Sequence, residues 1–194
     1  MYLPVHVGKA GSALDLGFQG DNTGDNISEK NPTFCELTGL YWAWKNLKAD
    51  YIGLAHYRRH FSNGQWWKSK TARVMTRQEA EKRLKKCSVL LPKPRHYWIE
   101  TNYSQYAHAH HAIDLDITRQ IVSEKYPAYL PVFEASMRRR KGHRFNMFIM
   151  KQDQLDAYCA WLFDILFELE KRLDITGYSK NDQRVFGFVG ERLL

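Results

Sequence analysis

The sequence predicts a single α/β domain over residues 1–194, and three observations support this. Segments with helical spacing alternate along the chain with short apolar runs that are typical of buried strands. Of the 194 residues, 44% are hydrophobic and 14% are aromatic, which is enough for one continuous core. No internal repeat or low-complexity segment divides the chain. We therefore expect helices packed on one sheet.

The first helix and the first strand are expected close together. After a loop rich in Gly, Asp and Asn, Asn31 suits an N-cap and Pro32 suits the first helical turn. Apolar residues then recur at helical spacing, which predicts a helix over residues 32–48. The apolar run at residues 51–55 predicts a buried strand that ends abruptly in the polar residues 56–60. This junction is the strongest candidate for a functional site.

The remaining elements alternate in the same way. Thr76 and Glu79 form the T-x-x-E pattern of a capping box, which predicts a charged helix as far as Lys86. Residues 88–91 predict a strand that two prolines end. The other expected elements are helices over residues 114–125, 128–140, 155–173 and 182–194 and a buried strand over residues 145–150.

Charge and composition narrow the class of partner and the compartment. The chain has 29 Lys and Arg against 21 Asp and Glu, and the formal charge of +8 favours nucleic acid, an anionic membrane or a sugar diphosphate. Three widely spaced cysteines without a C-x-x-C pair argue against a disulfide framework or a zinc site. The longest apolar stretch, residues 157–169, is too short to span a membrane, and no export signal pattern opens the chain. We therefore expect a cytoplasmic protein.

Five ordered blocks carry a resemblance to a known family. They are DNISEKNP and FCELTGLYWAWKN within residues 25–46, DYIGLAHYRR at 50–59, NMFIM at 146–150, WLF at 161–163 and RVFGF at 184–188. With these blocks the chain resembles bacterial glycosyltransferases from capsule and exopolysaccharide loci, whose domain was long labelled as of unknown function. The resemblance implies a GT-A-like, Rossmann-type three-layer sandwich that binds a nucleotide-sugar at the carboxyl edge of its sheet.

The resemblance also implies the reaction and the partners. The expected enzyme is a hexosyltransferase that moves a sugar from a UDP-linked donor to a growing capsule, exopolysaccharide or O-antigen acceptor. Some family members are similar to galactofuranosyltransferases, so UDP-galactofuranose is one candidate donor. The acceptor is expected to be lipid-linked or a growing saccharide, with peripheral contact at the cytoplasmic face of the membrane.

Two alternatives stay open. The chain lacks the short strand that in this family usually precedes residues 2–8, and it stops just after residues 191–194, so we expect truncation at both ends. An inactive fragment or an accessory subunit of a polysaccharide assembly complex is therefore the first alternative. A nucleic-acid-binding module would also explain the charge, but no RNP, KH, zinc-finger or helix-turn-helix pattern supports it, and nucleic acid is not the expected partner.

Candidate nucleotide-binding residues follow the strand at residues 51–55. Many GT-A enzymes hold a divalent metal there with a D-x-D motif, but this strand ends in a His-Tyr-Arg-Arg sequence. Two guanidinium groups can bind a diphosphate bidentately in place of a metal. We therefore predict Arg58 and Arg59 as leaving-group residues, His56 as a hydrogen-bond donor and no metal at this position. A salt-bridged strand end is the alternative.

Carboxylates are the candidates for the remaining roles. Asp25 and Asn26, in a flexible loop, and Glu36, on the first helix, are expected to bind the ribose or uracil of the donor. The alternative for the loop residues is that they satisfy their own turn. Transfer with inversion of configuration needs a base, and Asp182 and Glu191, which bracket the last helix, are two candidates.

Asp114 is the third candidate catalytic carboxylate. It opens the only D-x-D pattern, shared with Asp116, and it follows His108, His110 and His111, so a metal site of histidine and carboxylate ligands is conceivable. Alternatively Asp114 caps a helix while the histidines line a polar loop. As a further possibility, Asp114 or His111 contacts the acceptor sugar.

An aromatic pair and a basic run complete the candidates. Trp66, beside Trp67 in a loop, is expected to stack on the acceptor sugar, with core packing or a membrane interface as the alternatives. The basic run at residues 138–141 ends a helix and is expected to be a solvated helix end, although it also suits a phosphate.

Overall fold

In the computed structural model, which describes residues 2–194, the expected strands form one three-stranded sheet with the order β3-β7-β4. β3 (Tyr51–Leu54) and β4 (Val89–Leu90) lie on either side of β7 (Phe148–Lys151). In the register Ile52 is opposite Met150, and Leu90 is opposite Ile149. The strands predicted at residues 51–55, 88–91 and 145–150 are thus confirmed, each somewhat shorter than expected.

The strand directions differ from the Rossmann-type prediction. β3 and β4 both run antiparallel to β7, and the parallel pair within residues 2–194 is a separate one, β1 (Val5–His6) with β2 (Gln19–Gly20). An apolar run indicates that both faces of a strand are buried, but it carries no information on direction. A Rossmann-type sheet is mostly parallel, and that expectation came only from the family resemblance; the pairs of β7 with β3 and β4 do not follow it.

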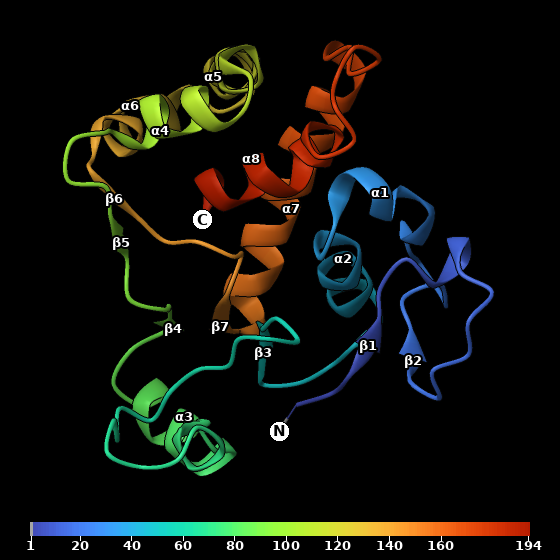
Figure 1. Ribbon diagram of the computed structural model, residues 1–194, viewed down its shortest axis with the longest axis vertical. Helices are drawn as coiled ribbons and strands as arrows, with labels where there is room; N and C mark the ends of the chain where they lie inside the picture. The colour runs from blue at the N-terminus through green and yellow to red at the C-terminus, as the bar shows by residue number, and fades with distance from the viewer. Residues whose placement is uncertain (1) are drawn as a thin grey trace.

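Both faces of the sheet are nevertheless covered, so that helix, sheet and helix form three layers. Successive side chains of a strand point to opposite faces. Phe148 and Met150 accordingly join the larger core, which includes α7 (Gln152–Arg172), whereas Ile149 joins a smaller core with α3 (Arg77–Leu84). Figure 1 shows α3 at the lower end of the molecule, well away from the helices at its upper end.

Helix α7 is the main support of the larger core. Its buried side chains recur at the three- and four-residue spacing of an amphipathic helix, and they are Leu155, Cys159, Leu162, Phe163, Ile165, Leu166 and Leu169. Each fully buried side chain of this size contributes about 1.5–3 kcal/mol relative to an exposed one. The bounds of α7 confirm the long helix predicted over residues 155–173. α5 and α8 pack on α7, so the C-terminal segment of the chain lies against it.

Three helices cluster at the upper end of the molecule in Figure 1. They are α4 (Asn102–Ala109), α5 (Ala112–Lys125) and α6 (Leu130–Arg138), beside the short antiparallel pair β5 (Arg95–His96) and β6 (Lys141–Gly142). α4 was not predicted, because its capping box uses Thr101 and Ser104 rather than the usual acidic partner. The expected loop of histidines is therefore wrong for His108, which lies within α4.

The predicted helix over residues 32–48 is two helices, α1 (Asn31–Phe34) and α2 (Leu37–Asn46). The break lies at Cys35, whose φ of 53° is in the left-handed region. The expected N-cap role of Asn31 is wrong, because a 3₁₀ turn precedes it and its side chain instead donates hydrogen bonds to Cys35 O at 2.8 Å and to Thr38 Oγ1 at 3.2 Å. Asn31 thus bridges the break between the two helices.

The predicted capping box at Thr76 and Glu79 is confirmed at the start of α3, and the predicted last helix is α8 (Val185–Leu193), which follows a 3₁₀ turn. That turn is η5 (Asp182–Arg184), and the other 3₁₀ turns are η1 (Lys9–Gly11), η2 (Ser28–Lys30), η3 (Thr71–Arg73) and η4 (Pro127–Tyr129). No helix in residues 2–194 has the length and apolar composition to cross a membrane.

Candidate functional site

Backbone strain marks the candidate site. Within residues 2–194 four non-glycine residues have a left-handed φ, and three of them, Cys35, Phe145 and Asn146, lie in one cluster with Glu36. Such residues persist only where the surrounding structure fixes them, and they are enriched at functional sites. This cluster lies where the break between α1 and α2 meets the start of β7 and the helix α8.

Glu36 is at the centre of the cluster and is engaged from two sides. Its Oε1 accepts a hydrogen bond from Asn146 Nδ2 at 2.8 Å and lies 3.6 Å from His56 Nε2. His56 Nε2 also donates to the carbonyl oxygen of Phe145 at 2.8 Å, which fixes the ring. Asn146 is fully buried, and its Nδ2 lies 3.2 Å from Gly187 O as well. The predicted residues Glu36 and His56 are thus in direct contact.

These contacts shift the pKa of both groups. Burial acts to raise the pKa of Glu36, but the interactions with His56 and Asn146 together outweigh it and hold that pKa below its usual value. The pairing with Glu36 raises the pKa of His56, against the opposing effect of burial. The pair therefore favours an ionised carboxylate beside a protonated imidazole.

Glu191, on α8, is the second carboxylate of the cluster. Burial raises its pKa, the neighbouring charge of Glu36 adds to this, and Arg192 and Arg144 oppose it. Two carboxylates whose environments push their pKa values in opposite directions are typical of acid and base assignments. Glu191, whose pKa is raised, is the one better suited to take up a proton.

Two glycines let α8 approach the break in the first helix. A Cβ on Gly187 would lie 3.2 Å from Cys35 Sγ, and a Cβ on Gly190 would lie 2.8 Å from Leu37 Cδ1. The two glycines are three residues apart and therefore share one face of the helix. This close approach brings Glu191 near Glu36, and the glycine spacing in the sequence was the signal that could have predicted it.

Two cations border the cluster. Arg184 Nε donates to Cys35 Sγ at 3.2 Å, and its guanidinium lies 5.2 Å from the centre of the Phe188 ring. Arg59 lies over the Phe145 ring at 3.9 Å. Of these two residues only Arg59 was predicted from the sequence, because Arg184 follows no strand end.

Arg58 does not accompany Arg59. The amide of Arg59 donates to His56 O at 3.1 Å, which closes a tight turn and leaves Tyr57 and Arg58 exposed at its corner. The Arg58 guanidinium lies over the Tyr57 ring at 5.0 Å. Neither arginine forms an ion pair with another side chain of residues 2–194, so the alternative of a salt-bridged strand end holds for His56, which pairs with Glu36, but not for Arg58 or Arg59.

A second pair of arginines interacts with Glu191, and the sequence did not predict it. Arg144 Nη2 and Arg192 Nη2 each donate to the same oxygen, Gln105 Oε1, at 2.5 Å. Both arginines also donate to Tyr97 Oη, Arg144 at 2.6 Å and Arg192 at 3.2 Å. The two terminal nitrogens are thus no more than about 5 Å apart, where unit charges repel by about 3 kcal/mol at an effective dielectric of ~20.

Asp114, Asp182 and His111 form a second cluster. Asp114 is 1% exposed, and its two oxygens accept hydrogen bonds from Tyr106 at 2.8 Å and Tyr178 at 2.6 Å. The His111 ring stacks on Tyr178 with 4.0 Å between centroids, and His111 Nε2 lies 3.9 Å from Asp182 Oδ2. Burial raises the pKa of Asp114. Three residues predicted separately are therefore neighbours.

The expectation that Asp114 caps a helix is wrong, because α5 begins at Ala112 with His111 as its N-cap residue. His110 Nδ1 donates to Asp182 Oδ1 at 3.2 Å, and the His110 ring stacks on Phe188 with 4.2 Å between centroids. Because Arg184 lies over the same Phe188, the second cluster adjoins the first.

The metal site suggested by the D-x-D pattern does not form. Asp116 accepts a hydrogen bond from Tyr103 at 2.8 Å, away from the partners of Asp114, because residues two apart on a helix face different directions. His108 pairs instead with Glu100 at 2.6 Å. In the part of the chain that the structure describes, no group of three or more His, Cys, Asp or Glu could hold a metal ion.

Asp25 and Asn26 lie apart from Glu36. Asn26 satisfies its own turn, since its side chain accepts from Ser28 N at 3.1 Å and donates to Gly24 O at 2.9 Å. Asn46, at the end of α2, donates to Asp25 O at 2.8 Å. Ten helical residues separate Glu36 from Asn46, which corresponds to about 15 Å. The structure thus does not bring the loop residues into contact with the Glu36 cluster.

Trp66 and Trp67 are both on the surface, with 76% and 66% of their areas exposed, and their rings pack edge to face at 6.0 Å. Core packing, one of the alternatives for this pair, is therefore wrong.

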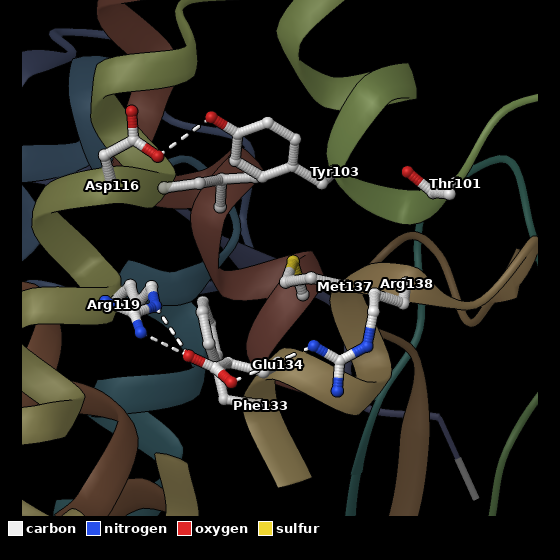
Figure 2. A pocket seen from close by; sticks show the side chains of 9 residues that line it. Thr101, Tyr103, Asp116, Arg119, Phe133, Glu134, Met137 and Arg138 are labelled. Carbon is white, nitrogen blue, oxygen red and sulfur yellow. Dashed lines mark hydrogen bonds and ion pairs between the residues drawn. The ribbon is translucent and has the colours of Figure 1, made fainter. Parts of the chain in front are cut away.

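A cavity of about 340 Å³ between α4, α5 and α6 lies away from these groups (Figure 2). Its polar side chains already satisfy one another. Tyr103 donates to Asp116, and Glu134 accepts from Arg119 Nε at 2.8 Å and lies 3.8 Å from Arg138. A crevice whose charges are paired internally is typical of helix packing, so we place the functional site at the Glu36 cluster instead.

Comparisons with known proteins agree with the resemblance found in the sequence. The chain is similar to the solved apo structure of WbbM, a bifunctional glycosyltransferase, with 36% identity and a TM-score of 0.88. The match covers 98% of this chain and 38% of that structure, so the chain spans about two-fifths of its length. No curated protein matches the chain. The model of the family described as domain of unknown function DUF4422 matches residues 1–194, and the chain belongs to this family.

Proposed function

We propose that the chain is a glycosyltransferase domain that transfers a sugar from a nucleotide-sugar donor to a saccharide acceptor. The observation that carries this proposal is the similarity to a bifunctional glycosyltransferase, at 36% identity over 98% of this chain. Because the chain spans 38% of that structure, we assign to it one of two transfer activities. The strained cluster around Glu36 supports the proposal independently, since it combines carboxylates with opposed pKa shifts and two bordering arginines.

In the proposed reaction an acceptor hydroxyl attacks the anomeric carbon as the bond from that carbon to the diphosphate breaks. Glu191 takes the hydroxyl proton if the configuration inverts, because its raised pKa matches that task. The nucleoside diphosphate leaves with the bonding electrons, and Arg59 and Arg184, beside the cluster, stabilise its negative charge. Glu36 holds His56 protonated as a further donor to the diphosphate.

The finer assignments are proposals of the same kind. We assign a UDP-linked donor, with UDP-galactofuranose as one candidate, and a capsule, exopolysaccharide or O-antigen acceptor that is growing or lipid-linked. The helix, sheet and helix layering supports a GT-A-like fold, and the +8 charge supports contact with an anionic membrane face. Asp114, Asp182 and His111 are proposed to flank the acceptor, with Trp66 as an exposed stacking surface, and Asp25 and Asn26 stay assigned to the donor nucleotide.

The test is sugar transfer by the purified chain from UDP-, GDP- and ADP-linked sugars to short saccharide acceptors, with the released nucleotide quantified. Thermal unfolding with each nucleoside diphosphate measures binding separately, because a ligand of the native state raises Tm. We expect UDP to raise Tm more than ADP or GDP and transfer to occur only from UDP-sugars. Equal shifts for all three nucleotides contradict the donor class. Binding without transfer to any acceptor assigns the chain to the alternative, an inactive or accessory unit.

A further inference from the structure

We infer that Arg144 and Arg192, with the basic cavity beside Arg192, form a binding site for a diphosphate group. The inference rests on the proposed function only for the kind of molecule that carries the diphosphate. Glu191 lines this cavity and interacts with both arginines, so the site is a second cationic region next to the same carboxylate.

The arrangement of the two guanidinium groups is the first observation. Both share the acceptors Gln105 Oε1 and Tyr97 Oη, and neither forms an ion pair with an acid in residues 2–194. Two neutral oxygens satisfy hydrogen bonds but do not cancel two like charges. Glu191 is the acidic residue of the neighbouring cavity, and one carboxylate offsets at most one of the two charges, so the pair favours a further anion between or beside them.

The cavity is the second observation. It encloses about 270 Å³, and Arg192, Arg139, Lys141 and His143 supply its basic lining, whereas Glu191 is its acidic residue. Neither Arg139 nor Lys141 is ion-paired within the described chain. The expected solvated helix end at residues 138–141 therefore also borders a cavity, which is the arrangement that an anionic ligand requires.

Unsatisfied hydrogen-bonding capacity is the third observation. Arg192 is only 9% exposed, and its Nε has no acceptor among the residues that the structure describes. A buried guanidinium nitrogen without a partner is costly, so it indicates a group that a ligand completes. Its position in the wall of the cavity points to a ligand that accepts hydrogen bonds and carries negative charge.

A diphosphate fits these features better than a single carboxylate. Guanidinium groups bind phosphate oxygens bidentately, and two adjacent guanidiniums match two linked phosphates. The volume lies just below the usual range for whole small-molecule ligands, so the cavity suits the diphosphate and leaves the attached group outside. Either a nucleotide-sugar donor or a lipid-linked acceptor could supply this diphosphate.

Isothermal titration of the full chain with inorganic pyrophosphate, UDP and farnesyl diphosphate tests the site. The variants are Arg144→Gln and Arg192→Gln, which remove the charge but keep a hydrogen-bond donor for the shared oxygens. Arg77→Gln, which removes the same charge from an exposed ion pair on α3, is the matched control. We expect each site variant to weaken pyrophosphate binding about tenfold to a hundredfold and the control to leave it unchanged.

The two organic ligands identify the source of the diphosphate. Together with the loss for pyrophosphate, a loss for UDP but not for farnesyl diphosphate assigns the site to the donor, in place of Arg59 and Arg184. A loss for farnesyl diphosphate but not for UDP assigns it to a lipid-linked acceptor. Unchanged binding of all three ligands in folded Arg144→Gln overturns the inference, even if Arg192→Gln does not fold. Sugar transfer is measured separately, so a chain that binds pyrophosphate through these arginines but transfers no sugar refutes the proposed function and leaves this site standing.

Discussion

Replacement of Asn146 separates the two roles that the structure gives this residue, a left-handed backbone and a double hydrogen-bond donor. Asn146→Ala removes a bond to a carboxylate, worth about 1.5–3 kcal/mol, and a bond to a backbone carbonyl, worth about 0.5–1.5 kcal/mol. Alanine at φ 50° adds about 1–2 kcal/mol of backbone strain. We therefore expect a total loss of about 3–6.5 kcal/mol in the free energy of unfolding.

Asn146→Gly loses the same two hydrogen bonds but adopts the left-handed backbone without that strain. It should therefore be more stable than Asn146→Ala by about 1–2 kcal/mol. Urea unfolding of both variants at neutral pH measures the difference, with Asn22→Ala on the exposed N-terminal loop as a control that should stay within about 0.5 kcal/mol of the wild type. Equal stability of the alanine and glycine variants would refute the argument from strain, and a loss below about 1 kcal/mol in both would refute the role of the hydrogen bonds.

Three further predictions concern chemistry and pH. Glu191→Gln should lower the rate of sugar transfer by about 10²–10⁴-fold with unchanged thermal stability, as expected for loss of a general base, and a rate near that of wild type would exclude this role. The stability from the Glu36–His56 pair should be greatest between about pH 5 and 6.5. Because the pKa of Glu36 is lowered, the stability that Glu36 contributes is present above its pKa in the unfolded chain and is lost as pH falls through its pKa in the folded protein. Because the pKa of His56 is raised, the stability that His56 contributes is complete below its pKa in the unfolded chain and is lost as pH rises through its pKa in the folded protein. The difference in urea stability between wild type and Glu36→Gln should therefore be largest in this window and should shrink as pH falls below it or rises above it, and a constant difference would contradict the pairing. Finally, sugar transfer should not depend on a metal at the end of β3 beside His56, because that strand end presents cations, so excess chelator should not abolish transfer. Complete loss of transfer in chelator, together with a metal bound beside His56, would contradict this prediction.

Features encoded by neighbouring residues could be predicted from the sequence. The capping box at Thr76 and the apolar strand that ends before His56 depend on contacts within a few residues, and both were found where expected. The N-cap assignment of Asn31 failed although it was equally local, because the 3₁₀ turn before it already supplies the start of the helix. Helix propensity ranks the residue types that suit a position in a helix, but it does not show whether a preceding turn already provides the start of that helix.

The candidate site was predicted in its parts but not as a whole. Glu36, His56 and Glu191 were each selected for their chemistry, yet their proximity depends on contacts between segments more than 100 residues apart, such as Asn146 with Glu36. Arg144 and Arg192 were not predicted, because neither belongs to a motif and their shared acceptors come from α4 and from the segment before it. Only the glycine spacing at Gly187 and Gly190 pointed toward a close helix contact.

The central position of β7 has a consequence for how the chain acquires its structure. β3 and β4 are both complete by residue 90, but each pairs only with β7, which begins at residue 148. Closing these long loops is entropically unfavourable, and contacts of such sequence separation form slowly. During synthesis both strands therefore wait unpaired until three-quarters of the chain has emerged. Aggregation through their exposed edges is thus the expected failure of refolding, and a segment that ends before residue 148 should not form the sheet.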